Sequence, residues 1–282
     1  MGGPLLLPQV RHKGSAGAEV YKMKIAIVSD EISSDFSTAV EIGTDWGVRA
    51  FEIRGLCSGR VPYTSRRDIE RVLEVKEEFG IEISALSPGA FKLPVDSEEV
   101  ERHLEDMLPR TYDLAHRLGT DLVIVFGFHR PRGRMGSYPS KVLDMLGRAA
   151  DSALKEGILL ALENEPGCWA DTGKLSAEIV KRVGHPNLRL NWDPCNSLSS
   201  GGKPYPEEYE EIKDIMVHLH IKDSREGRYV PVGEGDVNWR GQLRALLKDG
   251  FEGYYTLETH YGPKVKASRR CLENLRRILL EV

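Results

Sequence analysis

The chain contains few cysteines and no long apolar run. Its four cysteines are scattered over 282 residues, so they form no closely spaced metal-binding pair, and we expect reduced thiols in a cytoplasmic protein. No apolar stretch approaches the roughly 18 residues of a membrane helix, so we expect no membrane span. Residues 1–22 have a short apolar core broken by Pro8, too short for a signal peptide. We interpret them as a loosely ordered N-terminal extension.

Basic residues do not outnumber acidic ones either. The sequence has 39 Lys and Arg against 43 Asp and Glu, and its formal net charge is -4. Nucleic-acid-binding domains usually carry a basic face, so this balance argues against a nucleic-acid partner. We expect a small-molecule substrate and leave open whether the chain forms a homo-oligomer.

From residue 23 onward, short apolar runs alternate with longer amphipathic segments. Apolar runs of this length between turn signals are typical of buried strands, and the amphipathic segments have the periodicity of helices. The predicted strands are 24–29, 50–53, 81–86, 121–127, 158–163, 188–193, 215–220 and 253–258. The predicted helices are 36–46, 65–80, 97–119, 139–156, 173–183, 207–213, 238–249 and 265–280.

Strict alternation of this kind indicates a parallel sheet covered by helices. An open doubly wound sheet usually has a glycine-rich fingerprint after its first strand. The first predicted strand here runs into "SDEISSDF", which has no glycine. Eight repeats in a chain of this length therefore predict an α/β fold with a single (β/α)8 TIM barrel over residues 23–282.

Four of the predicted strands end in residues that can bind a metal. Glu163, Asp193, His220 and Glu258 close the last four strands, each about one strand–helix unit after the one before. Carboxyl ends of barrel strands form the active face, where three carboxylates would repel one another unless a cation neutralised them. The ligand types suit Mn²⁺ or Mg²⁺, with Co²⁺ or Zn²⁺ as alternatives. The alternative to a metal site is that these four residues are ordinary polar residues at strand ends and bind nothing.

Two residues near these ends have open roles. His218 and His220 are two apart on a strand and point to the same face, so His218 lies one layer deeper, either as a core histidine or as a support for the site. Glu165 shares parity with Glu163 but follows the strand. The sequence leaves two roles open for Glu165: it orients a metal ligand, or it is an ordinary solvent-exposed residue. We include both among the candidate substrate-binding residues.

Several segments together resemble the xylose-isomerase-like TIM-barrel superfamily of sugar isomerases and epimerases. They are "ALENEPG", "LNWDPCN", "HLHIKD", "VPVGEGDVNW" and "YYTLETH". Relatives include tagatose 3-epimerase, hydroxypyruvate isomerase and inosose dehydratase. The resemblance implies one divalent metal held by the same four residues. It also implies that Glu163 and Glu258 are the acid–base pair of an enzyme of carbohydrate metabolism.

The resemblance also suggests substrate-binding residues. Members often have a histidine three residues after the aspartate ligand, where this chain has Asn196. An arginine soon after the ligand histidine often binds substrate, and Arg225 is nearest, with Arg228 as the alternative. Neither position matches the family pattern perfectly.

The activity implied is isomerisation or epimerisation of a ketose, or a related small polyol-ketone, through a metal-stabilised cis-enediolate. The same ligands would serve an inosose-dehydratase-like lyase, which is the alternative. The superfamily's apurinic-site endonucleases need further histidines. Predicted strand three runs into "SALSPGAF" without one, and Asn196 replaces another, so a phosphodiesterase is the weakest interpretation.

Overall fold

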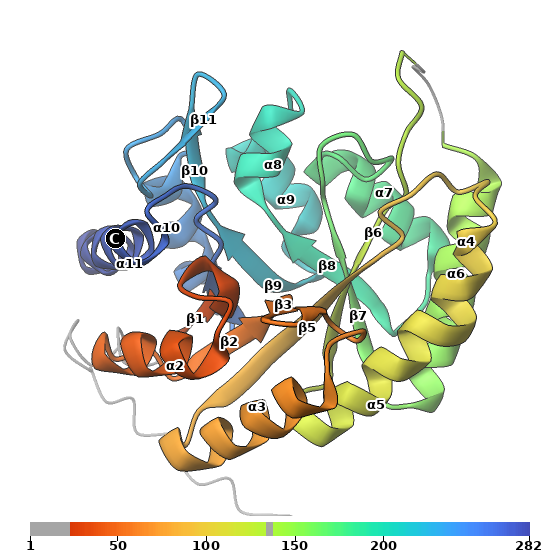
Figure 1. The fold of residues 1–282 in the computed structure, drawn as a ribbon. Coiled ribbons are helices and arrows are strands. Elements are labelled where there is room, and N and C mark those ends of the chain that lie inside the picture. The colour runs from red at the N-terminus through yellow and green to blue at the C-terminus, as the bar shows by residue number, and fades with distance from the viewer. Residues whose placement is uncertain (1–22, 134–137) are drawn as a thin grey trace, which may run out of the picture.

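Eight parallel strands close into a barrel surrounded by helices, as the alternating pattern predicts (Figure 1). The computed structural model describes residues 23–133 and 138–282, and the expected N-terminal extension, residues 1–22, lies outside the described residues. In their order around the barrel, the strands are β1 (Lys24–Val28), β2 (Ala50–Ile53), β5 (Glu82–Ala90), β6 (Leu122–Phe126), β7 (Leu159–Glu163), β8 (Leu188–Trp192), β9 (Met216–Ile221) and β12 (Tyr254–Leu257).

Side chains of each strand alternate between the inside of the barrel and the helical layer. On β6, Leu122, Ile124 and Phe126 pack with Ala85 and Ala161 in a small cluster. The residues between them belong to the large apolar core beneath the helices. Because both faces are buried, the strands read as continuous apolar runs rather than as alternating polar and apolar residues.

Helices cover the outside of the barrel and begin and end at residues that the sequence marks. The Ser65 hydroxyl accepts a hydrogen bond from the backbone N–H of Asp68 at the start of α3, and Gly80 ends that helix with φ of 58°. The covering helices are α2 (Phe36–Asp45), α3 (Arg66–Phe79), α4 (Glu99–Arg102), α5 (Leu108–Leu118), α6 (Ser140–Lys155), α7 (Gly173–Val183), α9 (Tyr209–Ile212), α10 (Trp239–Asp249) and α11 (Lys264–Glu281).

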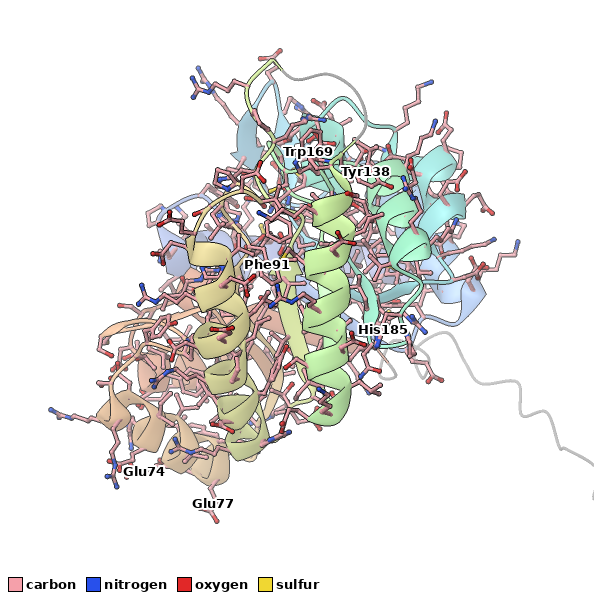
Figure 2. All side chains as sticks on the ribbon, turned by 90° about the vertical axis from the view of Figure 1, so that its right-hand side faces the viewer. Glu74, Glu77, Phe91, Tyr138, Trp169 and His185 are labelled. Carbon is pink, nitrogen blue, oxygen red and sulfur yellow. The ribbon has the colours of Figure 1, made fainter. Side chains whose placement is uncertain are left out.

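Two predicted helices differ in detail from the structure. The predicted helix 97–119 consists of α4 and α5 joined by a π-helical turn, η2 (His103–Met107). The predicted helix 207–213 consists of α9 preceded by a second such turn, η3 (Pro204–Glu208). Figure 2 shows the helical layer from outside, with Glu74 and Glu77 of α3 pointing to solvent. No helix in the described ranges is both long and apolar enough to cross a bilayer.

Short elements after the barrel strands build one rim, where Figure 1 shows α8 and the β10–β11 hairpin projecting beyond the barrel. Each single helix or strand among them has at most six residues, so the sequence pattern did not reveal it. They are η1 (Ser29–Glu31) after β1, the hairpin of β3 (Gly55–Leu56) and β4 (Gly59–Arg60) after β2, α8 (Pro194–Ser199) after β8, and the hairpin of β10 (Asp223–Arg225) and β11 (Arg228–Val230) after β9.

Candidate metal centre

The four side chains that the strand ends predict as ligands lie together at this rim. Glu163 is the last residue of β7, Asp193 caps the N-terminus of α8, His220 lies on β9, and Glu258 follows β12. Each offers one ligand atom, and these four atoms all lie within 4.8 Å of one another. All four side chains are buried.

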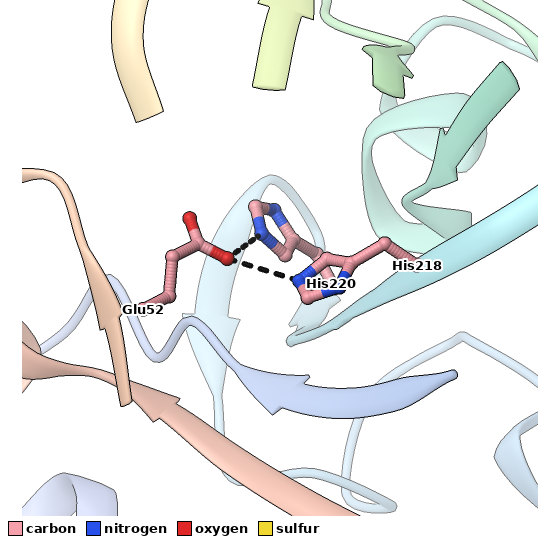
Figure 3. Close-up of side chains that lie close together, drawn as sticks. All are labelled: Glu52, His218 and His220. Carbon is pink, nitrogen blue, oxygen red and sulfur yellow. Dashed lines mark hydrogen bonds and ion pairs between the residues drawn. The ribbon is translucent and has the colours of Figure 1, made fainter. Parts of the chain in front are cut away.

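His220 is oriented by a residue that the sequence analysis did not identify, Glu52 on β2. Figure 3 shows the Glu52 carboxylate facing both His218 and His220. Nε2 of His220 lies 2.9 Å from Oε2 of Glu52. Its other nitrogen, Nδ1, lies 3.5 Å from Oε1 of Glu163 and 3.4 Å from Oε2 of Glu258. Nδ1 is therefore the atom that faces the other candidate ligands.

The Glu52 carboxylate is ionised and acts as a hydrogen-bond acceptor for both histidines. Burial raises the pKa of its carboxyl group, but His220 and His218 outweigh this effect and lower the pKa to about 2. An ionised carboxylate only accepts hydrogen bonds, so His220 donates from Nε2. The sequence offered one signal for Glu52, an acidic residue inside the short apolar strand "AFEI".

His218 lies in the interior of the barrel and does not line the cavity formed by the site residues. Its Nε2 is 3.0 Å from Oε2 of Glu52 and 3.0 Å from Oγ1 of Thr256, and its side chain is fully buried. Burial lowers the pKa of this imidazole, which favours the neutral ring. These contacts fit the alternative role of His218 as a core histidine that supports Glu52, and its binding of substrate stays a prediction.

Lys222 is a second residue that the sequence analysis missed. Its buried Nζ lies 2.8 Å from Oδ2 of Asp193 and 2.7 Å from Oε2 of Glu258. Burial lowers the pKa of this amine, but Asp193, Glu258 and Glu163 together raise it well above its usual range. The alternation in "HLHIK" could have revealed Lys222, because it lies two residues beyond His220 on the same face.

Glu258 is held by positive charge on several sides. Nη1 of Arg54 lies 2.7 Å from its Oε1, and Nε2 of His260 lies 3.1 Å from the same oxygen. Burial raises the pKa of Glu258, but Lys222, His220 and His260 lower it well below its usual range. Arg54 also contacts Asp30 and Glu31 after β1.

Glu163 is held mainly by neutral amides. Nδ2 of Asn191 lies 3.3 Å from its Oε2, and Nδ2 of Asn196 lies 3.4 Å from its Oε1. Asn196 also donates to Oε2 of Glu165 at 3.3 Å, while Oε1 of Glu165 accepts from Lys92 at 2.8 Å. Asn196 and Glu165, both predicted to bind substrate, therefore lie beside Glu163.

These residues open onto a cavity of about 370 Å³ at the mouth of the barrel. Glu163, Glu165, Asn196 and Glu258 line it, as the sequence suggested. The residues lining it that were not predicted are Arg54, Arg60, Ser87, Lys92, Phe126, Pro166, Lys222, Tyr229 and His260.

Arg225 does not line this cavity. It lies on β10 with 59% of its side chain exposed, and its Nε is 3.8 Å from Oδ1 of Asp236. Arg228, the alternative, is exposed on β11. The expected substrate contact of Arg225 is thus unsupported, because the hairpin after β9 carries its side chain out to solvent.

The candidate ligands suit a divalent cation in charge and in spacing. Lys222 contacts Asp193 and Glu258, and Arg54 also contacts Glu258, whereas Glu163 has no described lysine or arginine within ion-pairing distance. Arg54 also pairs with Asp30 and Glu31, so five carboxylates share two strong cations, and negative charge remains in excess. Ligand atoms about 2.1 Å from one ion lie at most about 4.2 Å apart, so atoms within 4.8 Å of one another need only small side-chain shifts to bind it together. The described residues therefore contain a site that could hold a divalent metal.

Comparison with known proteins places the fold among sugar-active and dehydratase enzymes. Residues 40–278 match the family model described as xylose isomerase-like TIM barrel. The chain is 24% identical to fructoselysine 3-epimerase of Escherichia coli O157:H7 over 273 residues, which cover 89% of this chain and 94% of the relative.

Two further matches are dehydratases. The chain is 28% identical over 205 residues to 3-dehydroshikimate dehydratase of Pseudomonas aeruginosa, and the match covers 69% of this chain but 31% of that protein. The crystal structure of the probable 3-DHS dehydratase AsbF of Bacillus anthracis superimposes with a TM-score of 0.76 at 17% identity, covering 90% of this chain and 98% of the other. This second likeness supports the fold alone.

Proposed function

The chain belongs to the xylose isomerase-like TIM barrel family, and we propose that it is a divalent-metal-dependent epimerase or isomerase of a small ketose. The observation that carries this proposal is the set of four ligand atoms within 4.8 Å of one another beside a cavity that Glu163 and Glu258 both line. When bound, a divalent cation supplies Lewis-acid polarisation of the substrate carbonyl. We propose Mn²⁺ or Mg²⁺, because oxygen ligands dominate the set.

Proton transfer falls to the two glutamates. Glu258 is ionised because of Lys222, His220 and His260, so it can accept the proton next to the substrate carbonyl. Glu163 receives neutral amide hydrogen bonds instead, and it enters the reaction protonated and gives this proton to the same carbon from the other side. Exchange with solvent then removes the proton from Glu258 and restores the one on Glu163. Positioned groups of this kind each contribute about 10²–10⁴-fold to the rate.

The remaining residues hold this pair in place. Arg54 and Lys222 fix the two oxygens of Glu258, and Asn196 links Glu163 to Glu165. Phe126 contributes an apolar surface to the floor of the cavity. Such support keeps the acid and the base on opposite sides of a bound substrate without rearrangement during the reaction.

The test is proton NMR in D₂O with the Mn²⁺-loaded and then Mg²⁺-exchanged protein and a panel of ketoses, 2-keto acids and inososes. The wild type should introduce deuterium next to the carbonyl and form a second sugar. Glu163→Gln should still exchange that hydrogen in the substrate without forming the second sugar. Glu258→Gln should lose exchange in the substrate. Unchanged turnover in both variants would contradict the acid–base assignment.

A lyase is the second candidate, and Lys222 is the observation that favours it. The ammonium of Lys222, which lines the cavity between Asp193 and Glu258, could hydrogen-bond a leaving hydroxyl and stabilise the negative charge that develops on it during dehydration. One relative that the chain resembles is a 3-dehydroshikimate dehydratase. Loss of water after deuterium exchange in the same NMR experiment would favour this reaction over epimerisation.

A further inference from the structure

The cavity contains one arginine without a negative partner. Each of the other strong cations lining it is paired: Arg54 with Glu258, Lys92 with Glu165, and Lys222 with both Asp193 and Glu258. Arg60 lines the same cavity but forms no ion pair with any described residue. The carboxylates of Glu163, Asp30 and Glu258 favour its charge from a longer distance, but none of them contacts the guanidinium directly.

Arg60 is also held in a fixed direction. It lies on β4, in the hairpin that follows β2, and its Nε donates to the carbonyl oxygen of Ser87 at 3.0 Å. Its Nη2 lies 3.3 Å from Oγ of Ser87. A Cβ atom added to Gly89 would lie 3.1 Å from Nε of Arg60, so glycine leaves the room that the guanidinium occupies.

This geometry leaves most of the guanidinium available. An arginine side chain has five N–H donors in a planar fork, and the structure gives acceptors to two of them, both on Ser87. The pKa of Arg60 is lowered, first by burial against the cavity wall and then by the nearby charge of Arg54. An anion beside Arg60 would favour the charged guanidinium and so oppose both of these effects on its pKa.

We propose that Arg60 and Ser87 form a subsite for an anionic group, a carboxylate or a phosphate, on the substrate. The inference rests on the proposed function, since it assigns the substrate class of the same cavity. Arg54, Lys92 and Lys222 each contact a carboxylate of the protein directly, and Arg60 contacts none among the described residues, so the guanidinium of Arg60 keeps a charge that a ligand can pair with. An anionic substrate neutralises this charge, and a neutral ketose does not. The planar fork suits two-point contact with either anion.

The test compares binding of a neutral ketose with that of its anionic relatives. Calorimetry would use D-fructose, D-fructose 6-phosphate and 5-keto-D-gluconate at millimolar concentration. Each would be measured with Mg²⁺-loaded and metal-free wild type, Arg60→Gln, Arg60→Lys and the control Arg66→Gln. Arg66 suits as control because 90% of its side chain is exposed on α3. Mg²⁺ affinity of each variant shows that the metal centre is intact.

One anionic ligand should bind more tightly than D-fructose, and Arg60→Gln should weaken it by about ten- to hundredfold, as expected for hydrogen bonds to a charged group. D-fructose should change less than twofold, and Arg66→Gln should change neither. The phosphate and carboxylate ligands show which anion the subsite takes, and Arg60→Lys shows whether the fork is needed.

Equal losses for charged and neutral ligands in Arg60→Gln would overturn the subsite, as would binding of neither anion. A failure of the proposed function has a different signature. In that case anion binding would still depend on Arg60, but no ligand would exchange its hydrogen with D₂O.

Discussion

The Glu52 carboxylate on β2 accepts a 2.9 Å hydrogen bond from Nε2 of His220 on β9, across the barrel and 168 residues away in sequence. This bond turns Nδ1 of His220 toward Glu163 and Glu258. Partners of this kind fix the tautomer and the ring orientation of metal-binding histidines. Glu52 is therefore a positioning residue for the candidate metal centre.

Replacing Glu52 by Gln should weaken metal binding by about 10–100-fold, the usual effect of losing such a partner. The glutamine amide can donate as well as accept, so it no longer restricts His220 to one tautomer. Calorimetric titration with Mn²⁺ measures the effect, and the ring nitrogen shifts of His220 in ¹⁵N NMR report its tautomer. Glu77→Gln, at the exposed position seen in Figure 2, is the control. Unchanged affinity and tautomer in Glu52→Gln would refute the role.

Lys222→Met should make the fold depend on metal. Without the ammonium, Asp193 and Glu258 lose their buried positive partner, which typically costs about 3–5 kcal/mol of unfolding free energy. A divalent cation replaces that charge, so Mn²⁺ should raise Tm more in the variant than in the wild type. Thermal melting with and without Mn²⁺ measures this difference.

The control for this substitution is Lys203→Met, because Lys203 has 77% of its side chain exposed. Its melting temperature should follow the wild type under both conditions. If Mn²⁺ raised Tm equally in Lys222→Met and the wild type, Lys222 and the metal would not share the same negative charges.

Asp223→Ala should lower the free energy of unfolding by about 3 kcal/mol, roughly 1 kcal/mol for each of three hydrogen bonds, because it leaves one buried and two partly buried donors without an acceptor. The Asp223 carboxylate accepts from the backbone N–H groups of Gly233, Gly235 and Val237, and so anchors the segment before α10. Urea denaturation measures the change, and the exposed Asp96→Ala is the control. A loss below about 1 kcal/mol, the scale of a single ordinary hydrogen bond, would show that water satisfies these donors.

Only Cys57 should react quickly with iodoacetamide in the folded protein. Cys57 is exposed, whereas the other three cysteines are buried. Burial raises the pKa of both Cys168 and Cys195 to about 12, so these thiols stay protonated between pH 7 and 9. Mass spectrometry of labelled peptides should find one modified site over that range, and all four after denaturation. Rapid labelling of Cys168 in the folded state would contradict the buried environment.

The order of strands and helices follows from the sequence alone, because the burial of both strand faces leaves continuous apolar runs between amphipathic segments. Its four strand-end ligand candidates, Glu163, Asp193, His220 and Glu258, also lie together, since the carboxyl ends of parallel strands meet at one rim. Local pattern could not place Arg225, whose direction depends on the short hairpin after β9.

Only tertiary structure decided which side chains support the centre. In the sequence, Glu52 and Lys222 are single charged residues within or directly after apolar strands. Their roles come from contacts between segments, Glu52 with His220 across the barrel and Lys222 with Asp193 at the end of the neighbouring strand. The position of Arg60 likewise depends on the tertiary structure, which brings its hairpin against Ser87 and Gly89. Residues that share a strand or a strand end are predictable because the backbone period fixes their positions. Contacts between distant segments depend on barrel closure and rim geometry, which no local pattern encodes.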